Sequence, residues 1–205
     1  MAIEIVVSGK SYKGISYTEY MDRTKIKLLS TNPNNLTEEE MKLFYYTKLN
    51  LQRSIRIEKN YIVSDKLKSL LSSISQEQSW LILTEDWCGD SAQNLPYINK
   101  IAECNAKVKL CILLRDSNPE LMDQYLTNGS RSIPKLIAFD TKGTEVFKWG
   151  PRPKVAQELF INLKKQGMPK PEIYENLHMW YTQNHGKEIE KEFTELLQII
   201  LNKYI

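Results

Sequence analysis

Trp80-Leu81-Ile82-Leu83-Thr84 is a compact apolar run of strand length, and Trp87-Cys88-Gly89-Asp90-Ser91 follows it after two acidic residues. A helical pattern begins at about Ser91 and extends to Cys104. The sequence therefore predicts a strand, a tight turn and a helix, with Cys88 at the first helical turn. Backbone N–H groups there lack partners within the helix, and the positive end of the helix dipole favours an anion. A cysteine in that place is a candidate thiolate nucleophile.

Strand and helix patterns alternate downstream of this turn. The expected order is strand, helix, strand, strand and helix, over Val108–Leu114, Asn118–Leu126, Pro134–Phe139, Glu145–Trp149 and about Lys154–Lys165. Strand–helix alternation predicts parallel strands, and the short turn before the last strand predicts an antiparallel hairpin. The central part of the chain is thus expected to be an α/β unit with a mixed sheet.

Helical patterns flank this central part. Thr37-Glu38-Glu39-Glu40 is a capping box, which predicts a long amphipathic helix from about Thr37 to Lys59. Ser64-Asp65 can cap another helix, and Ile3–Val7 is a candidate short strand. Two further helical stretches follow Pro169-Lys170-Pro171. We therefore expect an N-terminal helical extension (residues 1–79), an α/β core (80–166) and a C-terminal helical extension (167–205), with both extensions packed on the core.

Several short sequences in this order resemble the thioredoxin superfamily. They are Asp86-Trp87-Cys88-Gly89 after the strand, Pro96 in the following helix, the Ser132-Ile133-Pro134 turn and the Trp149-Gly150 pair. The longer segment from Thr84 to Pro96, together with Trp149-Gly150-Pro151-Arg152-Pro153, resembles a bacterial branch of this superfamily that carries helical extensions. The resemblance implies a thioredoxin-like fold, a mixed sheet with flanking helices, plus additional N- and C-terminal helices.

The resemblance also implies a substrate site around Cys88. Ile133-Pro134 would be a cis peptide beside the thiol, and its backbone would pair with an extended substrate by strand addition. Trp87, Gly89, Trp149 and Gly150 would line the same groove. Plain core packing is the alternative for the two tryptophans.

Acidic side chains near Cys88 would raise its pKa, and basic ones would lower it. Asp90, together with Glu85 and Asp86, disfavours a second anion, whereas Arg131 and Arg152 would offset these charges if the turns meet. The sequence leaves the net direction open. It also leaves open whether Cys88 is a reactive thiol or a small buried apolar residue.

The second cysteine of a thioredoxin turn is replaced here by Ser91, and a hydroxyl cannot resolve a mixed disulfide. Cys104 should lie about 24 Å from Cys88 along the helix, and Cys111 about 13 Å from the active-site end of its strand. Both fall inside apolar patterns and are expected to be inert core thiols. Ile82 stands where redox-active thioredoxins carry a buried acid, and Asp90 stands where they usually carry proline.

These departures favour a monothiol protein, in which Cys88 forms a mixed disulfide with a protein or low-molecular-weight thiol and an external thiol resolves it. Ser91 would then donate a hydrogen bond to the Cys88 sulfur. The alternative is a redox-inactive module that binds a protein or peptide segment in the groove. A third hypothesis, that the protein is a peroxidase, has less support, because no Thr or Arg set around Cys88 identifies a peroxide site.

The composition excludes several other classes. A formal charge of +3, from 28 Lys/Arg against 25 Asp/Glu, gives no basis for nucleic-acid binding. No apolar stretch approaches the ~20 residues of a membrane span, and the N-terminus does not resemble a signal peptide. Three cysteines do not make a disulfide framework, so a reducing, cytoplasmic compartment is expected. Nothing at ligand spacing accompanies His178 and His185, and no glycine-rich phosphate loop is present, so we expect neither metal nor cofactor.

Overall fold

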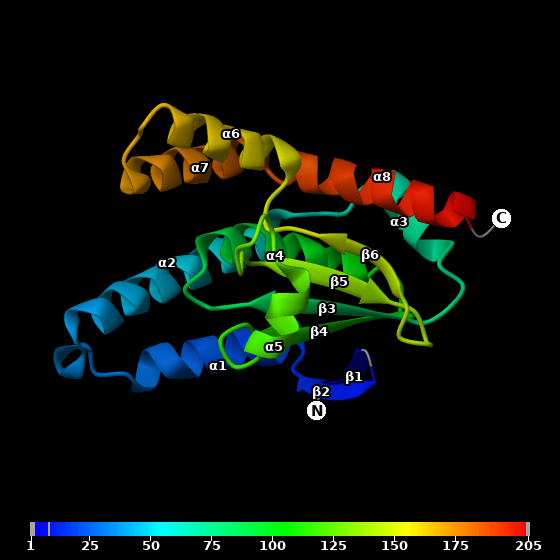
Figure 1. Cartoon of the computed structure of the whole chain (residues 1–205), viewed down its shortest axis with the longest axis horizontal. Coiled ribbons are helices and arrows are strands. Elements are labelled where there is room, and N and C mark those ends of the chain that lie inside the picture. The colour runs from blue at the N-terminus through cyan, green and yellow to red at the C-terminus, as the bar shows by residue number, and fades with distance from the viewer. Residues whose placement is uncertain (1–2, 8, 204–205) are drawn as a thin grey trace.

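The computed structural model describes residues 3–7 and 9–203, and a four-stranded sheet lies at its centre (Figure 1). The strands lie in the order β4-β3-β5-β6; their bounds are β3 (Gln78–Thr84), β4 (Val108–Leu114), β5 (Lys135–Phe139) and β6 (Glu145–Trp149). β3 and β4 are parallel, whereas β5 is antiparallel to both β3 and β6. The structure therefore confirms a mixed sheet and the predicted β5–β6 hairpin.

The expectation that β5 would run parallel to the first two strands is wrong. Only a single helical turn, α5 (Pro119–Met122), and a 3₁₀ turn, η2 (Asp123–Tyr125), separate β4 from the loop before β5. A parallel connection needs a crossover that carries the chain back along the sheet. Here Lys135, the first residue of β5, pairs with Leu83 near the end of β3, so the chain re-enters the sheet at the edge where it left.

Side chains of β3 alternate between two apolar clusters, one on each face of the sheet. Trp80 and Ile82 point into a cluster completed by α2 (Glu38–Asn60), α3 (Asp65–Ser72), α4 (Gly89–Ala102) and α8 (Lys187–Lys203). Leu81 and Leu83 point into the opposite cluster, which also contains Cys88 and Ile133. Because both faces are covered, β3 is almost continuously apolar, as expected of a central strand.

The N-terminal extension contains more strand than its sequence indicated. The predicted strand β1 (Ile3–Val7) pairs with β2 (Lys10–Gly14) in an antiparallel hairpin, and Ile15 bridges to Ile112 on β4. β2 was not predicted, because Tyr12 is its only large apolar side chain. Helix α1 (Tyr17–Ser30) and a 3₁₀ turn, η1 (Pro33–Asn35), lead into α2, whose capping box at Thr37 and Glu40 is confirmed. Ser64 caps α3, also as predicted.

Three helices form the C-terminal part of the chain. α6 (Lys154–Lys165) packs beside α7 (Lys170–Asn184), and α8 packs against α3 and α4. Figure 1 shows α6 and α7 projecting over one end of the molecule, on the same side as the N-terminal half of α2. Among the described residues, no helix is both long enough and apolar enough to cross a membrane.

Candidate thiol site

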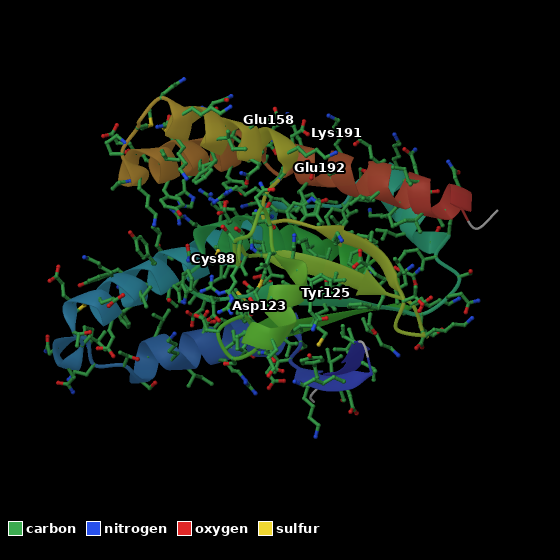
Figure 2. The ribbon with its side chains drawn as sticks, in the orientation of Figure 1. Cys88, Asp123, Tyr125, Glu158, Lys191 and Glu192 are labelled. Carbon is green, nitrogen blue, oxygen red and sulfur yellow. The ribbon has the colours of Figure 1, made fainter. Side chains whose placement is uncertain are left out.

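Cys88 is the N-cap residue of α4, at the end of the loop that follows β3 (Figure 2). Its backbone N–H donates to the Glu85 carbonyl, and its carbonyl accepts from the Ala92 N–H, each at 3.1 Å. The helix begins at Gly89, two residues earlier than predicted. Only 8% of Cys88 is exposed, so any reaction partner must reach it through a narrow opening.

The Cys88 sulfur faces the cis-proline turn. Its Sγ–H donates to the carbonyl oxygen of Ile133 at 3.4 Å, and the Ile133–Pro134 peptide bond is cis. Ser91 follows in the first turn of α4, and the Thr84 hydroxyl donates to Ser91 Oγ at 2.6 Å. The proton of the Ser91 hydroxyl is therefore free to be donated elsewhere.

The net effect of these surroundings is a raised pKa for the Cys88 thiol. Burial is the largest cause and the charge of Asp90 the second; the bonds from Ser91 and from the backbone N–H groups lower the pKa but do not compensate. The pKa rises to about 11. The sequence left this direction open, because it did not show whether Arg131 and Arg152 would offset the nearby acids.

Asp90 is a buried carboxylate held by side chains from the loop before α6 and from α7. Arg152 binds it through both carboxylate oxygens, Nε to Oδ1 at 2.9 Å and Nη2 to Oδ2 at 2.7 Å, with each side chain only 10% exposed. The Tyr181 hydroxyl donates to Oδ1 at 2.8 Å, and Asn94 donates to that hydroxyl at 3.0 Å. The residue in place of the usual proline is therefore the anchor point of α7 on the thiol turn.

Arg131, the second arginine expected to offset negative charge near Cys88, is placed elsewhere. Its guanidinium forms a bidentate, exposed ion pair with Asp123, both bonds at 2.7 Å. A cation that sequence analysis missed, Arg115, lies instead over the ring of Trp87, 5.0 Å from its centroid. Arg115 also donates to the Arg131 carbonyl at 3.2 Å, so it joins the loop before Pro134 to the thiol loop.

The two tryptophans expected in the groove have different environments. Trp87 is partly exposed and packs against the cluster that contains Cys88 and Ile133. Trp149 is only 7% exposed, its Nε1–H donates to Glu192 at 2.6 Å, and its ring packs on Phe193 of α8. Trp149 is therefore a core residue, which corrects the expectation that it lines a groove.

Gly150 fits closely against the cis-proline turn. Its φ is +109°, and a Cβ built there would lie 2.2 Å from the carbonyl oxygen of Pro134. No other residue type fits that approach without moving the backbone. Gly150 therefore sets the position of the Pro134 turn and, through Ile133, of the carbonyl that faces Cys88.

His178 of α7 covers the other side of the thiol turn. A Cβ on Gly89 would lie 2.9 Å from the His178 ring, and His178 Nδ1 lies 3.4 Å from Gln93 Nε2. Burial, and to a lesser extent the charge of Arg53, lowers the pKa of His178 to about 4. Sequence analysis assigned this histidine to surface or interhelix packing; only its helical register relative to Tyr181 hinted at a shared face.

Because His178 has a lowered pKa in the folded protein, the unfolded chain binds one more proton between pH 6.5 and about 4. The free energy of unfolding should therefore fall as the pH falls through this window, by at most about 3 kcal/mol at 1.36 kcal/mol per unit. Urea unfolding at pH 7 and pH 4 measures the difference. His178→Gln should shrink it, whereas the same change at the exposed His185 should leave it unchanged. If both variants changed the pH dependence of the free energy of unfolding equally, His178 would not be its source.

Neither a second reactive thiol nor a free buried acid accompanies Cys88 among the residues considered next. Cys111 is fully buried in β4, whereas Cys104, expected in the core, is only partly buried beyond the end of α4; all three cysteines are free. Ile82 is fully buried in the apolar core. A buried acid is present at Glu85, whose pKa is raised by burial, but its carboxylate accepts from the Asp116 N–H at 2.8 Å.

A cysteine at the N-terminus of a helix after a central strand, facing a cis-proline turn, defines a thioredoxin-like protein with a single cysteine in its active-site turn. The family model described as thioredoxin matches residues 37–165, more than half of the chain. The chain therefore belongs to the thioredoxin family, as the sequence predicted. The matched region ends before α7, which supplies Tyr181 and His178.

Two solved structures share the fold over most of their length. A protein of unknown function from Pseudomonas aeruginosa is 16% identical, with a TM-score of 0.53 and coverage of 90% of this chain and 98% of that protein. An HIV epitope-scaffold is 17% identical, with a TM-score of 0.51 and the same coverage. At this identity the likeness concerns the fold alone. No match was found among curated proteins.

Proposed function

We propose that the protein carries out monothiol thiol–disulfide exchange through Cys88, with an external thiol as the resolving partner. The observation that supports this most is the position of the Cys88 sulfur at the N-terminus of α4, in contact with the Ile133 carbonyl of the cis-proline turn. Ser91 occupies the place of a resolving cysteine and can donate a hydrogen bond but no electrons. Internal release of a mixed disulfide is therefore absent from the proposed reaction.

The reaction has two steps. The Cys88 thiolate attacks one sulfur of a substrate disulfide; a new bond forms to Cys88, the substrate bond breaks, and the leaving thiolate takes up a proton. A free thiolate then attacks the substrate sulfur of the mixed disulfide, and Cys88 leaves as a thiolate that regains its proton. A protein or low-molecular-weight disulfide is the substrate class, and a reducing, cytoplasmic compartment would supply the resolving thiol.

The raised pKa of Cys88 affects both steps. A thiol of high pKa is deprotonated to a small extent at neutral pH, but its thiolate is strongly nucleophilic and is a poor leaving group. Mixed disulfides on Cys88 should therefore form slowly and last long. This favours a protein that holds its partner covalently for a period over a fast disulfide reductase.

Alkylation of Cys88 as a function of pH tests the proposal. With a pKa of about 11, the rate at pH 8 should be about two orders of magnitude below that of free cysteine and should rise about tenfold per pH unit. Ser91→Ala removes a hydrogen bond to the thiolate and should slow the reaction at pH 8 by about tenfold. Peptide mass spectrometry separates Cys88 from the partly exposed Cys104.

Thr84→Val is the matched control, because it removes the donor to Ser91 Oγ and leaves the Ser91 hydroxyl in place. Its effect should be smaller than that of Ser91→Ala. A Cys88 that stays unreactive up to pH 11 in the folded protein would rule out exchange chemistry.

The second candidate is a redox-inactive module that binds a protein or peptide segment. The burial of Cys88, with its thiol donating to the Ile133 carbonyl, favours this alternative. Trapping under oxidative load distinguishes the two functions. A partner linked to wild-type Cys88 and lost from Cys88→Ser supports exchange, whereas a partner retained without a covalent bond by Cys88→Ser supports the binding module.

A further inference from the structure

A groove of about 910 Å³ lies between α2, the α2–α3 loop, α4, the C-terminal end of α7 and α8, and Tyr181 of α7 is among its lining residues. Its volume is within the range of small-molecule sites, which is about 300–1,000 Å³. Cys88 is not among its lining residues, whereas Gln93 and Tyr97 of α4 form part of its wall. The groove is therefore a second candidate site, separate from the thiol.

Aromatic rings form one wall of the groove. Tyr61 and Tyr97 meet edge to face with their centroids 4.7 Å apart, and Ile57 and Ile62 lie beside them. The Tyr97 ring packs directly against Gly186 of the α7–α8 turn. A Cβ at that position would lie 2.2 Å from the ring, so only glycine allows this contact. Tyr61 is partly exposed and Ile62 is exposed, whereas Tyr97 is only 7% exposed and lies behind Tyr61. The Tyr61 side of this wall therefore offers a flat organic ring an apolar, aromatic surface.

Cations from three elements surround the same space. Arg56 of α2, Lys66 of α3 and Lys187 of α8 line the groove, and none of them forms an ion pair with another described residue. Lys191 also lines it and lies 3.5 Å from Glu188. Unpaired cations that converge from separate elements create a positive potential suited to an anion.

The lining has fewer acids than cations. Glu190 accepts from the Tyr61 hydroxyl at 2.7 Å and from the Ser64 N–H at 3.3 Å, and these neutral donors leave its negative charge in place. With Glu195, two acids stand against the four cations named above, of which Lys191 is also paired with Glu188. The groove therefore keeps an excess of positive charge beside its aromatic wall.

We propose that this groove binds an aromatic anion of nucleotide size, with the ring on Tyr61 and the phosphates on Arg56 and Lys187. The proposal is independent of Cys88 chemistry. The side chains that would recognise the phosphates come from separate elements and not from a glycine-rich loop, so no local sequence pattern indicates this site.

Calorimetric titration of the full chain with ADP tests the proposal. ADP should saturate the site with a Kd below about 1 mM, and adenosine and inorganic pyrophosphate should each bind at least about tenfold more weakly, since each carries half of the recognised chemistry. Arg56→Glu and Lys187→Glu should each weaken ADP binding by at least about tenfold. Both side chains are exposed, so the variants should fold, which thermal unfolding verifies.

Two controls make the result decisive. Lys164→Glu makes the same charge change on an exposed position of α6 outside the groove and should leave ADP binding unchanged. Cys88→Ser should also bind ADP like the wild type, which separates this site from the thiol. Absence of saturation below about 1 mM, equal weakening by Lys164→Glu, or pyrophosphate binding as tight as that of ADP would overturn the proposal.

Discussion

Replacing Asp90 with asparagine is expected to lower the free energy of unfolding by about 3–5 kcal/mol, because it leaves the buried Arg152 without its counter-charge. The same change should make Cys88 more reactive. Asp90 is the second-largest cause of the raised pKa of Cys88, after burial, so removing its charge lowers that pKa. A less stable protein with a more reactive thiol is an unusual combination, and the two effects have one origin.

Urea unfolding gives the first effect, and the alkylation rate of Cys88 at pH 8 under native conditions gives the second. Asp123→Asn is the matched control, because it removes the same charge from the exposed ion pair with Arg131. That variant should unfold at nearly the same urea concentration as the wild type, because exposed ion pairs contribute little, and should leave the alkylation rate unchanged. Equal losses in the two variants would show that the pair between Asp90 and Arg152 does not anchor the thiol turn.

Features carried by neighbouring residues could be predicted from the sequence. The capping box at Thr37 and the cap at Ser64 depend on side chains three residues apart, and both are present. β4 was predicted with its bounds, because a continuous apolar run between polar residues is typical of a buried strand. The alternation of strand and helix patterns also predicted the order of the elements in the core, which the structure shows, and the family match confirms the thioredoxin resemblance.

Features that depend on distant residues could be predicted only in part. Arg152, 62 positions from Asp90, was expected to offset its charge if the turns meet, and it does. Tyr181 is 91 positions from Asp90, and no local pattern indicates that it joins them. Local patterns also gave no measure of how deeply Cys88 is buried, and burial decides the direction of its pKa. The direction of β5 was mispredicted for a related reason, since it depends on where the preceding loop returns to the sheet.

Asp90 also links the thiol turn to the part of the chain outside the family match. Through Arg152 and Tyr181 it connects the first turn of α4 to the loop before α6 and to α7, while His178 of α7 covers Gly89. The C-terminal helices are therefore part of the immediate surroundings of Cys88. Their displacement would remove both the charge partner of Asp90 and the cover over Gly89.

Restoring a second thiol by Ser91→Cys should convert slow external release into fast internal release. Positions 88 and 91 lie one helical turn apart at the start of α4, so a side chain at position 91 can face the Cys88 sulfur. An introduced thiol there acts at an effective concentration of millimolar or higher, so release of a group bound to Cys88 should be faster by at least about 100-fold than with micromolar external thiol.

A disulfide reagent with a coloured leaving thiolate measures this directly. Wild-type Cys88 should release one equivalent on loading and keep the other until thiol is added, whereas Ser91→Cys should release the second equivalent unaided. Both proteins carry Cys104→Ser, because Cys104 is partly exposed. Ser91→Ala is the matched control and should retain the second equivalent like the wild type. If a folded Ser91→Cys protein also retains it, residue 91 cannot reach a group on Cys88, and the missing resolving thiol is not what makes this a monothiol site.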